Sequence, residues 1–345
     1  MKRFMTRKPD KERLRAALLR QPADHVPYWE AGVCRRNLEF LFERKEVPEI
    51  SWLLGPEDQL ALAQMTGQDA IPVAGVFSLL ARARVKAPNG ALRYLEEGEL
   101  KSWDMLERLV PYSEDEVRSR VEPIRASLEL VKDTGLGVWS AVGAFWQQAW
   151  QTVGFNDFMM KVADDLDFVR RLIEYLAAPA VTAAEMLCEY PLTFLGLFDN
   201  IATSKGPFIA PDTFKPLWCP WAKAIAAPAR AKGIPAFLNT DGKLDWVLDD
   251  IVDLGFDAIN PVDPNGNDIF EVKENYGDKL CLVGGVNQAW PLGFGTPEEV
   301  DRTVKDCIER LGRGGGYVVT SSHDIGDNVP PENWVAMIQA VEKYG

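Results

Sequence analysis

The sequence predicts a single domain of the α/β class, a closed (β/α)8 or TIM barrel with helical additions at its N-terminus. The first observation is a strand–helix–strand unit, in which the apolar runs 234–239 and 258–263 flank a helical pattern at 244–252. Such a unit implies parallel strands joined by a right-handed crossover. The second observation is that eight apolar runs, each followed by helical spacing, can be traced through the 345 residues. No GxGxxG turn follows the first run, which makes a doubly wound open sheet the weaker alternative.

The predicted strands share an apolar run that ends in small or polar residues. In chain order they cover residues 26–30, 70–76, 137–145, 192–200, 234–239, 258–263, 279–287 and 316–323. Helical spacing marks residues 11–19, 35–42, 56–65, 114–132, 155–163, 165–188, 211 onward, 244–252, 296 onward and 331–343. Pro211 and Pro297 stand at first helical positions, and Thr296 with Glu299 has the spacing of a capping box.

Two segments lie outside the predicted barrel repeat. Residues 1–22 form an N-terminal helix that is broken by Pro22 and Pro27. Residues 77–112 are irregular and rich in charge, and we interpret them as an excursion over the barrel mouth. Residues 1–345 are expected to form one domain, because barrels with insertions reach this length.

The composition limits the class of protein and its partners. Hydrophobic residues make up 47% of the chain, yet no apolar run reaches the roughly 18 residues of a membrane span. The basic start, Met1–Lys8, lacks the apolar core of a secretory signal, so we expect a soluble, cytoplasmic protein. A net charge of −13 disfavours nucleic acid and membranes as partners, because both need a basic face. The five cysteines include no CxxC pair, which argues against a disulfide framework.

Polar residues at the carboxyl ends of the predicted strands are the candidates for a site, because parallel barrel strands end at one mouth. They are Glu30, Trp146, Asp199, Asn200, Asn239, Asp241, Asp263, Asn287, His323 and Asp324. An imidazole with carboxylates from other strands is a donor set that suits zinc or harder divalent ions. Two alternatives stay open: His323 hydrogen-bonds a loop, and Asp241 caps the following helix.

Tryptophan is abundant near the early strands and their loops. The set comprises Trp29, Trp139, Trp146, Trp150, Trp218 and Trp221. Aromatic walls suit a flat apolar substrate. Core packing is the stronger interpretation for Trp139, whereas Trp146, which with Phe145 closes the third strand, is the better candidate for a wall. Arg35 and Arg36 are candidates for clamping a carboxylate, although a solvated helix face is the commoner use of such a pair.

A set of short segments carries a family resemblance. They are Gly206–Phe214, Gly255–Pro261, Val283–Asn287, Gly295–Val300 and Pro330–Asn333, with Pro22–Pro27 and Gly143–Phe145 in the first half. Together they resemble the superfamily of uroporphyrinogen decarboxylase and the cobalamin-dependent methyltransferases related to it. Members of this superfamily are (β/α)8 barrels, so the resemblance implies the fold that the strand count predicts.

The two branches of this superfamily differ at positions that the sequence shows. The decarboxylases bind the carboxylates of a tetrapyrrole through Arg-Gln-Ala-Gly-Arg after the first strand, and here Glu30 stands where the first arginine–glutamine pair would lie. The methyltransferases hold zinc with a His-x-Cys after strand five and a Cys after strand eight. Here these places read Asn239–Asp241 and His323. The resemblance therefore implies the methyltransferase branch, with zinc that polarises an ether or similar oxygen rather than a thiol.

The resemblance also implies roles for individual residues. Asp241 and His323 would hold the metal or a proton donor against the substrate oxygen, and Glu30 or Asp199 would complete the set. A carboxylate that acts as general acid without a metal is the alternative. The residues expected to bind the substrate are Trp29, Phe145, Trp146, Asp199, Asn239 and Asn287.

The implied function is a methyltransferase that takes a methyl group from a small methylated compound, preferably a methoxylated aromatic. The acceptor would be cobalamin carried by a separate corrinoid protein. One alternative is a decarboxylase that acts on another carboxylate, with Arg35 and Arg36 as the clamp. A non-catalytic binder of a ligand or of the corrinoid protein is a further alternative. A homodimer is compatible with the sequence.

Overall fold

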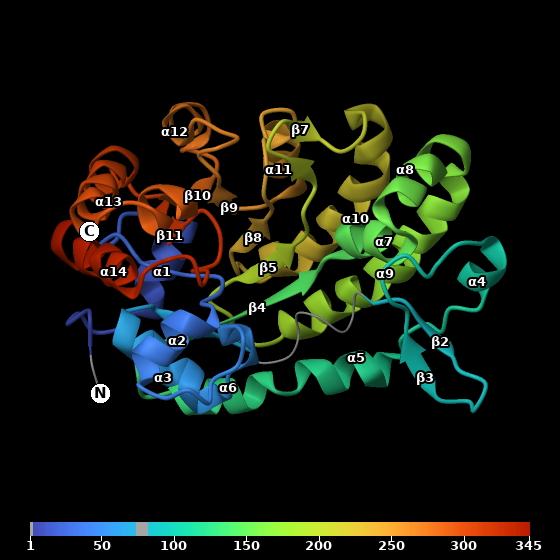
Figure 1. Ribbon diagram of the computed structural model, residues 1–345, viewed down its shortest axis with the longest axis horizontal. Coiled ribbons are helices and arrows are strands. Elements are labelled where there is room, and N and C mark those ends of the chain that lie inside the picture. Colours follow the sequence, from blue (N-terminus) through green and yellow to red (C-terminus); the bar gives the residue numbers. More distant parts are fainter. Residues whose placement is uncertain (1–2, 74–81) are drawn as a thin grey trace.

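The computed structural model describes residues 3–73 and 82–345, which form an α/β barrel (Figure 1). Its main sheet holds seven parallel strands in the order β1-β4-β5-β8-β9-β10-β11. Their bounds are β1 (Ala70–Pro72), β4 (Gly137–Gly143), β5 (Leu195–Phe198), β8 (Ala236–Asn239), β9 (Ala258–Val262), β10 (Cys281–Val286) and β11 (Tyr317–Ser321). Each lies within a predicted apolar run, and the predicted fold class is confirmed.

A short segment around Trp29, within the first predicted strand, completes the barrel beside the seven strands of the sheet. Trp29 N donates to the Val319 carbonyl (3.1 Å) and Val319 N donates to the Pro27 carbonyl (2.9 Å), so the segment runs parallel to β11. On its other side, within the described ranges, no backbone hydrogen bond joins it to β1. A side chain spans this seam instead, because Glu30 N donates to Gln68 Oε1 (3.1 Å).

Helices surround the sheet (Figure 1). Their bounds are α1 (Lys11–Leu18), α2 (Arg35–Phe42), η1 (Ser51–Leu53), α3 (Pro56–Thr66), α5 (Glu114–Val121), α6 (Ile124–Val131), α7 (Phe145–Val153), α8 (Phe155–Asp164), α9 (Leu166–Leu187), α10 (Pro211–Ala231), α11 (Leu248–Leu254), α12 (Ile269–Tyr276), η2 (Gln288–Gly293), α13 (Pro297–Leu311) and α14 (Pro331–Tyr344). None of the helices in the two described stretches is both long and apolar enough to cross a membrane.

The predicted helices are confirmed with two adjustments. The pattern at 114–132 forms two helices, because Pro123 has no N–H to continue the first. The helix predicted at 244–252 begins only at Leu248. The capping box of Thr296 and Glu299 is formed as predicted.

The end of the third strand was predicted too far along the chain. β4 ends at Gly143, and Phe145 and Trp146 open α7, which the sequence analysis did not predict. The apolar run continues from the strand into the first turn of this helix, so hydrophobic periodicity alone does not mark the boundary. Gln147 and Gln148 consequently lie in the first turn of a helix that starts at the barrel mouth.

The segment predicted as an irregular excursion contains regular elements. They are β2 (Arg84–Lys86) and β3 (Leu92–Tyr94), paired as an antiparallel hairpin, and α4 (Trp103–Glu107). A second small hairpin is formed by β6 (Ala202–Thr203) and β7 (Gly206–Pro207). Residues 74–76 of the second predicted strand and 77–81 of the excursion lie outside the described residues.

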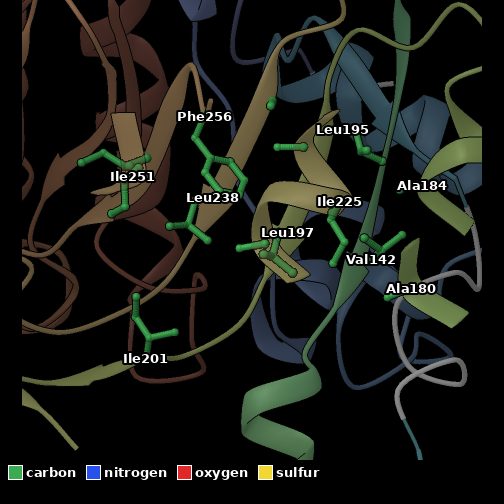
Figure 2. Close-up of a cluster of buried hydrophobic side chains, with 14 of the residues drawn as sticks. Val142, Ala180, Ala184, Leu195, Leu197, Ile201, Ile225, Leu238, Ile251 and Phe256 are labelled. Atoms are coloured by element: carbon green, nitrogen blue, oxygen red, sulfur yellow. The ribbon is translucent and has the colours of Figure 1, made fainter. Parts of the chain in front are cut away.

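Two layers of packing fix the barrel. Inside it, the ring of Trp29 lies edge-on to Trp139 and Phe237, with ring centroids 5.4 and 5.3 Å apart. Outside it, Figure 2 shows Leu197 of β5 beside Ile225 of α10, within the larger hydrophobic cluster. Because both faces of the sheet are covered, its strands are apolar along nearly their whole length.

Candidate active site

A cavity of about 520 Å³ opens at the carboxyl ends of the barrel strands. Six of the candidate site residues line it together, namely Asp199, Asn200, Asn239, Asp241, His323 and Asp324. They follow β5, β8 and β11, so the rule that strand ends converge at the mouth holds for them. This cavity is the candidate active site.

A smaller cavity of about 260 Å³ lies beside the first. Its lining includes Asn287, the predicted residue after β10, together with Asp263 and Asn265. The two cavities share two lining residues, Asp241 and His323. These side chains therefore stand where the cavities meet, and a group bound in either one can contact them.

Asp241 lies directly after β8 and is partly buried. Its backbone N donates to Asn200 Oδ1 (3.1 Å), which holds the residue at the mouth. Burial raises the pKa of its carboxyl group, nearby His323 opposes the shift, and Asp263 adds to it. The interpretation of Asp241 as a helix cap is wrong, because α11 begins only at Leu248 and its N-cap is another residue.

His323 and Asp324 form a pair after β11. Asp324 N donates to His323 Nδ1 (2.9 Å), so the neutral imidazole carries its proton on Nε2. The imidazole is largely exposed, whereas the Asp324 side chain is mostly covered. Burial raises the pKa of the Asp324 carboxyl, with His323 opposing the shift and Asp241 adding to it. The loop after β11 therefore supplies a second acid to the same cavity.

Asp199, at the end of β5, is buried and fixes the start of α7. Its Oδ1 accepts from Gln147 N (2.9 Å), and its Oδ2 accepts from Trp146 N (3.1 Å) and Trp218 Nε1 (3.0 Å). Burial raises the pKa of this carboxyl group to about 7, against the N–H donors, which favour the charged form. Asp199 thus lines the cavity while its oxygens are engaged by the protein itself.

Glu30 lies behind the cavity wall rather than in it. Its Oε2 accepts from Thr320 Oγ1 (2.8 Å) and Ser321 Oγ (2.7 Å), and its Oε1 accepts from Ser321 N (3.0 Å). Thr320 and Ser321 line the cavity, and Glu30 does not. Burial raises the pKa of the Glu30 carboxyl to about 8.

The predicted metal set of Asp241, His323 and Glu30 does not assemble. Glu30 is engaged by hydroxyl and amide donors of β11. Among the described residues, no three histidine, cysteine, aspartate or glutamate side chains are grouped so that they could hold a metal ion. The pair of Asp241 and His323 alone falls short of the three protein ligands of a catalytic zinc site, so the residues present do not fit such a metal.

The aromatic residues predicted as walls lie in the core instead. Trp29 is packed inside the barrel, Phe145 lies against Trp218 (6.4 Å between centroids), and Trp146 is edge-on to Phe214 (4.8 Å). All of them are fully buried, and none lines the cavity. The aromatic side chains that do line it are Phe198 of β5 and Trp52 of η1.

Several lining residues were missed by the sequence analysis. Gln147 and Gln148 follow β4 and would have been found had the end of that strand been placed at Gly143. Trp52 and Arg82 come from loops, where neither a strand end nor a motif marks them. The predicted arginine clamp lies elsewhere: Arg35 pairs with Glu49 (3.8 Å), Arg36 contacts Asp327, and neither lines the cavity.

Comparisons with known proteins agree with this architecture. The family model "Uroporphyrinogen decarboxylase (URO-D)" matches residues 80–344. The uroporphyrinogen decarboxylase of Coxiella burnetii is 23% identical over 353 aligned positions, which cover 96% of this chain and 95% of that protein. The same enzyme of Methylococcus capsulatus is 33% identical over 128 residues, or 36% of this chain and 35% of that one. Among solved structures, a methyltransferase from Methanosarcina mazei superposes with a TM-score of 0.72 at 18% identity, covering 98% and 99% of the two chains.

Proposed function

The chain belongs to the uroporphyrinogen decarboxylase family, and from this premise we propose that it is a methyltransferase. It moves a methyl group from a small methylated substrate, preferably a methoxylated aromatic, to the corrinoid of a separate protein. The family match supports an enzyme. The barrel that it shares with the Methanosarcina mazei methyltransferase is compatible with this reaction.

The observation that carries the proposal is the pair of cavities that meet at Asp241 and His323. A group transfer needs room for two reactants that reach the same atoms, whereas decarboxylation of one compound needs a single cavity. The larger cavity suits the methyl donor, since Phe198 offers it an aromatic surface. The smaller one suits the approach of the acceptor.

The charges in the larger cavity argue against a substrate rich in carboxylates. Of the described residues that line it, Arg82 is the one lysine or arginine, while Asp199, Asp241 and Asp324 are acids. A tetrapyrrole with many carboxylates would need several cations there. Arg35 and Arg36, the candidates for a carboxylate clamp, are engaged outside the cavity.

In the proposed mechanism, a general acid donates a proton to the ether oxygen as it leaves. The corrinoid carried by the partner protein would supply the nucleophile for the methyl carbon, and residues of this chain would assist the departure of the ether oxygen. The leaving phenolate needs a proton, and Asp241 or Asp324 can donate one because burial raises the pKa of both. His323 lies beside both acids, and a positive charge on its imidazole would lower their pKa against the larger effect of burial.

The test is a turnover assay with the purified protein, reduced corrinoid and a panel of methylated compounds. The proposal expects methylcobalamin, followed by its absorbance, and an equal amount of phenol from a methoxyarene. No methyl transfer from any methoxyarene, methylamine or methyl thioether would overturn it. Carbon dioxide release without corrinoid would identify a decarboxylase instead.

A further inference from the structure

We propose that Arg82 binds a carboxylate of the methyl donor, so that the substrate is a methoxylated aromatic acid. This inference rests on the proposed methyl transfer and names its substrate class. It starts from the one cationic side chain among the described residues that line the larger cavity.

The Arg82 guanidinium has no carboxylate partner among the described residues, although the cavity it lines is acidic elsewhere. Its Cζ lies 5.6 Å from the centroid of the Tyr94 ring, a cation–π contact with the β2–β3 hairpin. Arg84, two residues later, differs in this respect, because it is buried and paired with Glu116 (2.7 Å). Of these two arginines, Arg82 is therefore the one whose guanidinium can bind the carboxylate of a ligand.

The polar groups of the cavity are divided between two sides. Arg82 follows β1, and Gln147 and Gln148 follow β4, which is the neighbour of β1 in the sheet. The acids Asp241 and Asp324 follow β8 and β11. One side therefore offers N–H donors and a positive charge, and the other side offers protonatable oxygens.

A flat ligand that spans the two sides must carry complementary groups at its ends. A carboxylate matches the fork of Arg82 and the glutamine amides, because guanidinium and carboxylate form charge-assisted hydrogen bonds. The ether oxygen then lies at the acids, which donate the proton that its departure needs. Phe198 of β5, the strand between β4 and β8, lines the cavity and would face the ring, and Pro261 of β9 also lines it.

The experiment compares a methoxybenzoate with its neutral benzamide analogue in the wild type and in Arg82→Gln. In the wild type the acid should have the higher kcat/KM. In Arg82→Gln we expect kcat/KM for the acid to fall about tenfold or more, with little change for the amide. Arg82→Lys keeps the charge and should recover part of the loss.

The matched control is Arg93→Gln, an exposed arginine of β3 that pairs with Glu99 and does not line the cavity. It should leave both substrates unchanged. Equal kcat/KM for acid and amide in the wild type, or an equal loss of both in Arg82→Gln, would overturn the carboxylate assignment. Calorimetric binding of the two compounds gives the same comparison without turnover, so a failure of the proposed reaction is distinguished from a failure of this inference.

Discussion

Asp241 combines burial with a lack of stabilising donors, and this combination sets its chemistry. Within the described part of the chain, no hydrogen bond reaches its carboxyl oxygens, while its backbone is held by Asn200. Desolvation therefore dominates and raises its pKa. Asp199 shows the contrast, because three N–H groups contact its oxygens. Of the two, Asp241 is the group that is free to give up a proton to a ligand.

Replacing Asp241 by asparagine should lower kcat for a methoxyarene by about 10²–10⁴-fold, the usual contribution of a general acid. In the wild type the rate should fall as the pH rises through the raised pKa of this group, because only the protonated form donates. This decrease of the rate with rising pH should be absent in the Asp241→Asn variant. For a methoxyarene with a strongly electron-withdrawing ring, kcat should fall less in the variant, because its phenolate leaves more easily without a proton.

The control for this substitution is Asp245→Asn, an exposed acid that pairs with Lys243 near the same loop. It should keep the wild-type rate and pH profile. An Asp241→Asn variant with wild-type kcat would assign the proton to Asp324 or remove general-acid catalysis from the mechanism.

Glu30 is a buried acid, and the geometry of its hydrogen bonds also accommodates a protonated carboxyl group. The Ser321 hydroxyl has one hydrogen but lies against both Glu30 Oε2 and the His323 carbonyl. If Glu30 carries a proton, its Oε2 donates to Ser321 Oγ instead of accepting from it, and Ser321 Oγ donates to the His323 carbonyl. The raised pKa of about 8 agrees with a protonated Glu30 at neutral pH.

Glu30→Gln should therefore change the pH dependence of stability. The folded protein keeps the Glu30 proton up to about pH 8, whereas the ordinary pKa is 4.5, so this residue destabilises the fold progressively as pH rises between these values. The neutral glutamine has no such effect, and the stability of the variant relative to the wild type should rise over this range and level off above it. Urea unfolding at a series of pH values measures this difference, and a constant difference would contradict a protonated Glu30.

At the scale of elements, the junction of β5 and α7 shapes the cavity. The carboxylate of Asp199 receives the first N–H groups of α7 and so acts as its N-terminal cap from another strand. Gln147 and Gln148 enter the cavity from this helix. The position of two wall residues thus depends on one buried carboxylate.

Asp199→Ala should lower the free energy of unfolding by about 1–3 kcal/mol, because it removes a cap and leaves the buried Trp218 N–H without an acceptor. KM for the methyl donor should rise as Gln147 and Gln148 lose their fixed place. Chemical denaturation and steady-state kinetics measure the two effects. Thr182→Ala, on the exposed side of α9, should change neither, and unchanged stability in Asp199→Ala would contradict the capping role.

The sequence predicts these elements well where periodicity and length agree. The strands β8 to β11 are predictable because buried parallel strands are continuous apolar runs. The helices α9 and α13 are predictable because apolar residues recur along one helical face. Site residues at strand ends, such as Asn239 and His323, follow from the same rule. Trp52 and Arg82 reach the cavity through the path of loops, which depends on tertiary packing and leaves no periodic signal.

At the scale of the whole molecule, the barrel has one weak seam. The segment around Trp29 is bonded to β11, but between it and β1 the described structure shows a side-chain bridge from Gln68 in place of a backbone ladder. β10, by contrast, is paired on both sides. The barrel is closed by packing at this seam more than by hydrogen bonds.

Hydrogen exchange should therefore be faster at 27–30 and 68–72 than at 281–286, because opening the seam breaks fewer bonds than freeing β10. Mass spectrometry of peptides from the folded protein resolves these segments. Gln68→Ala should speed exchange at the seam, while Gln64→Ala on α3 should not. Equal protection of the seam and of β10 would show that packing alone makes the closure complete.

The meeting of the two cavities at Asp241 and His323 also predicts the order of events in the proposed reaction. In the proposed methyl transfer, donor and acceptor would occupy the protein together, so we expect the rate to depend on a ternary complex with no methylated enzyme form. The methyl carbon would then be displaced once, from the side opposite the departing oxygen. A chiral methyl group would consequently reach the acceptor with its configuration inverted.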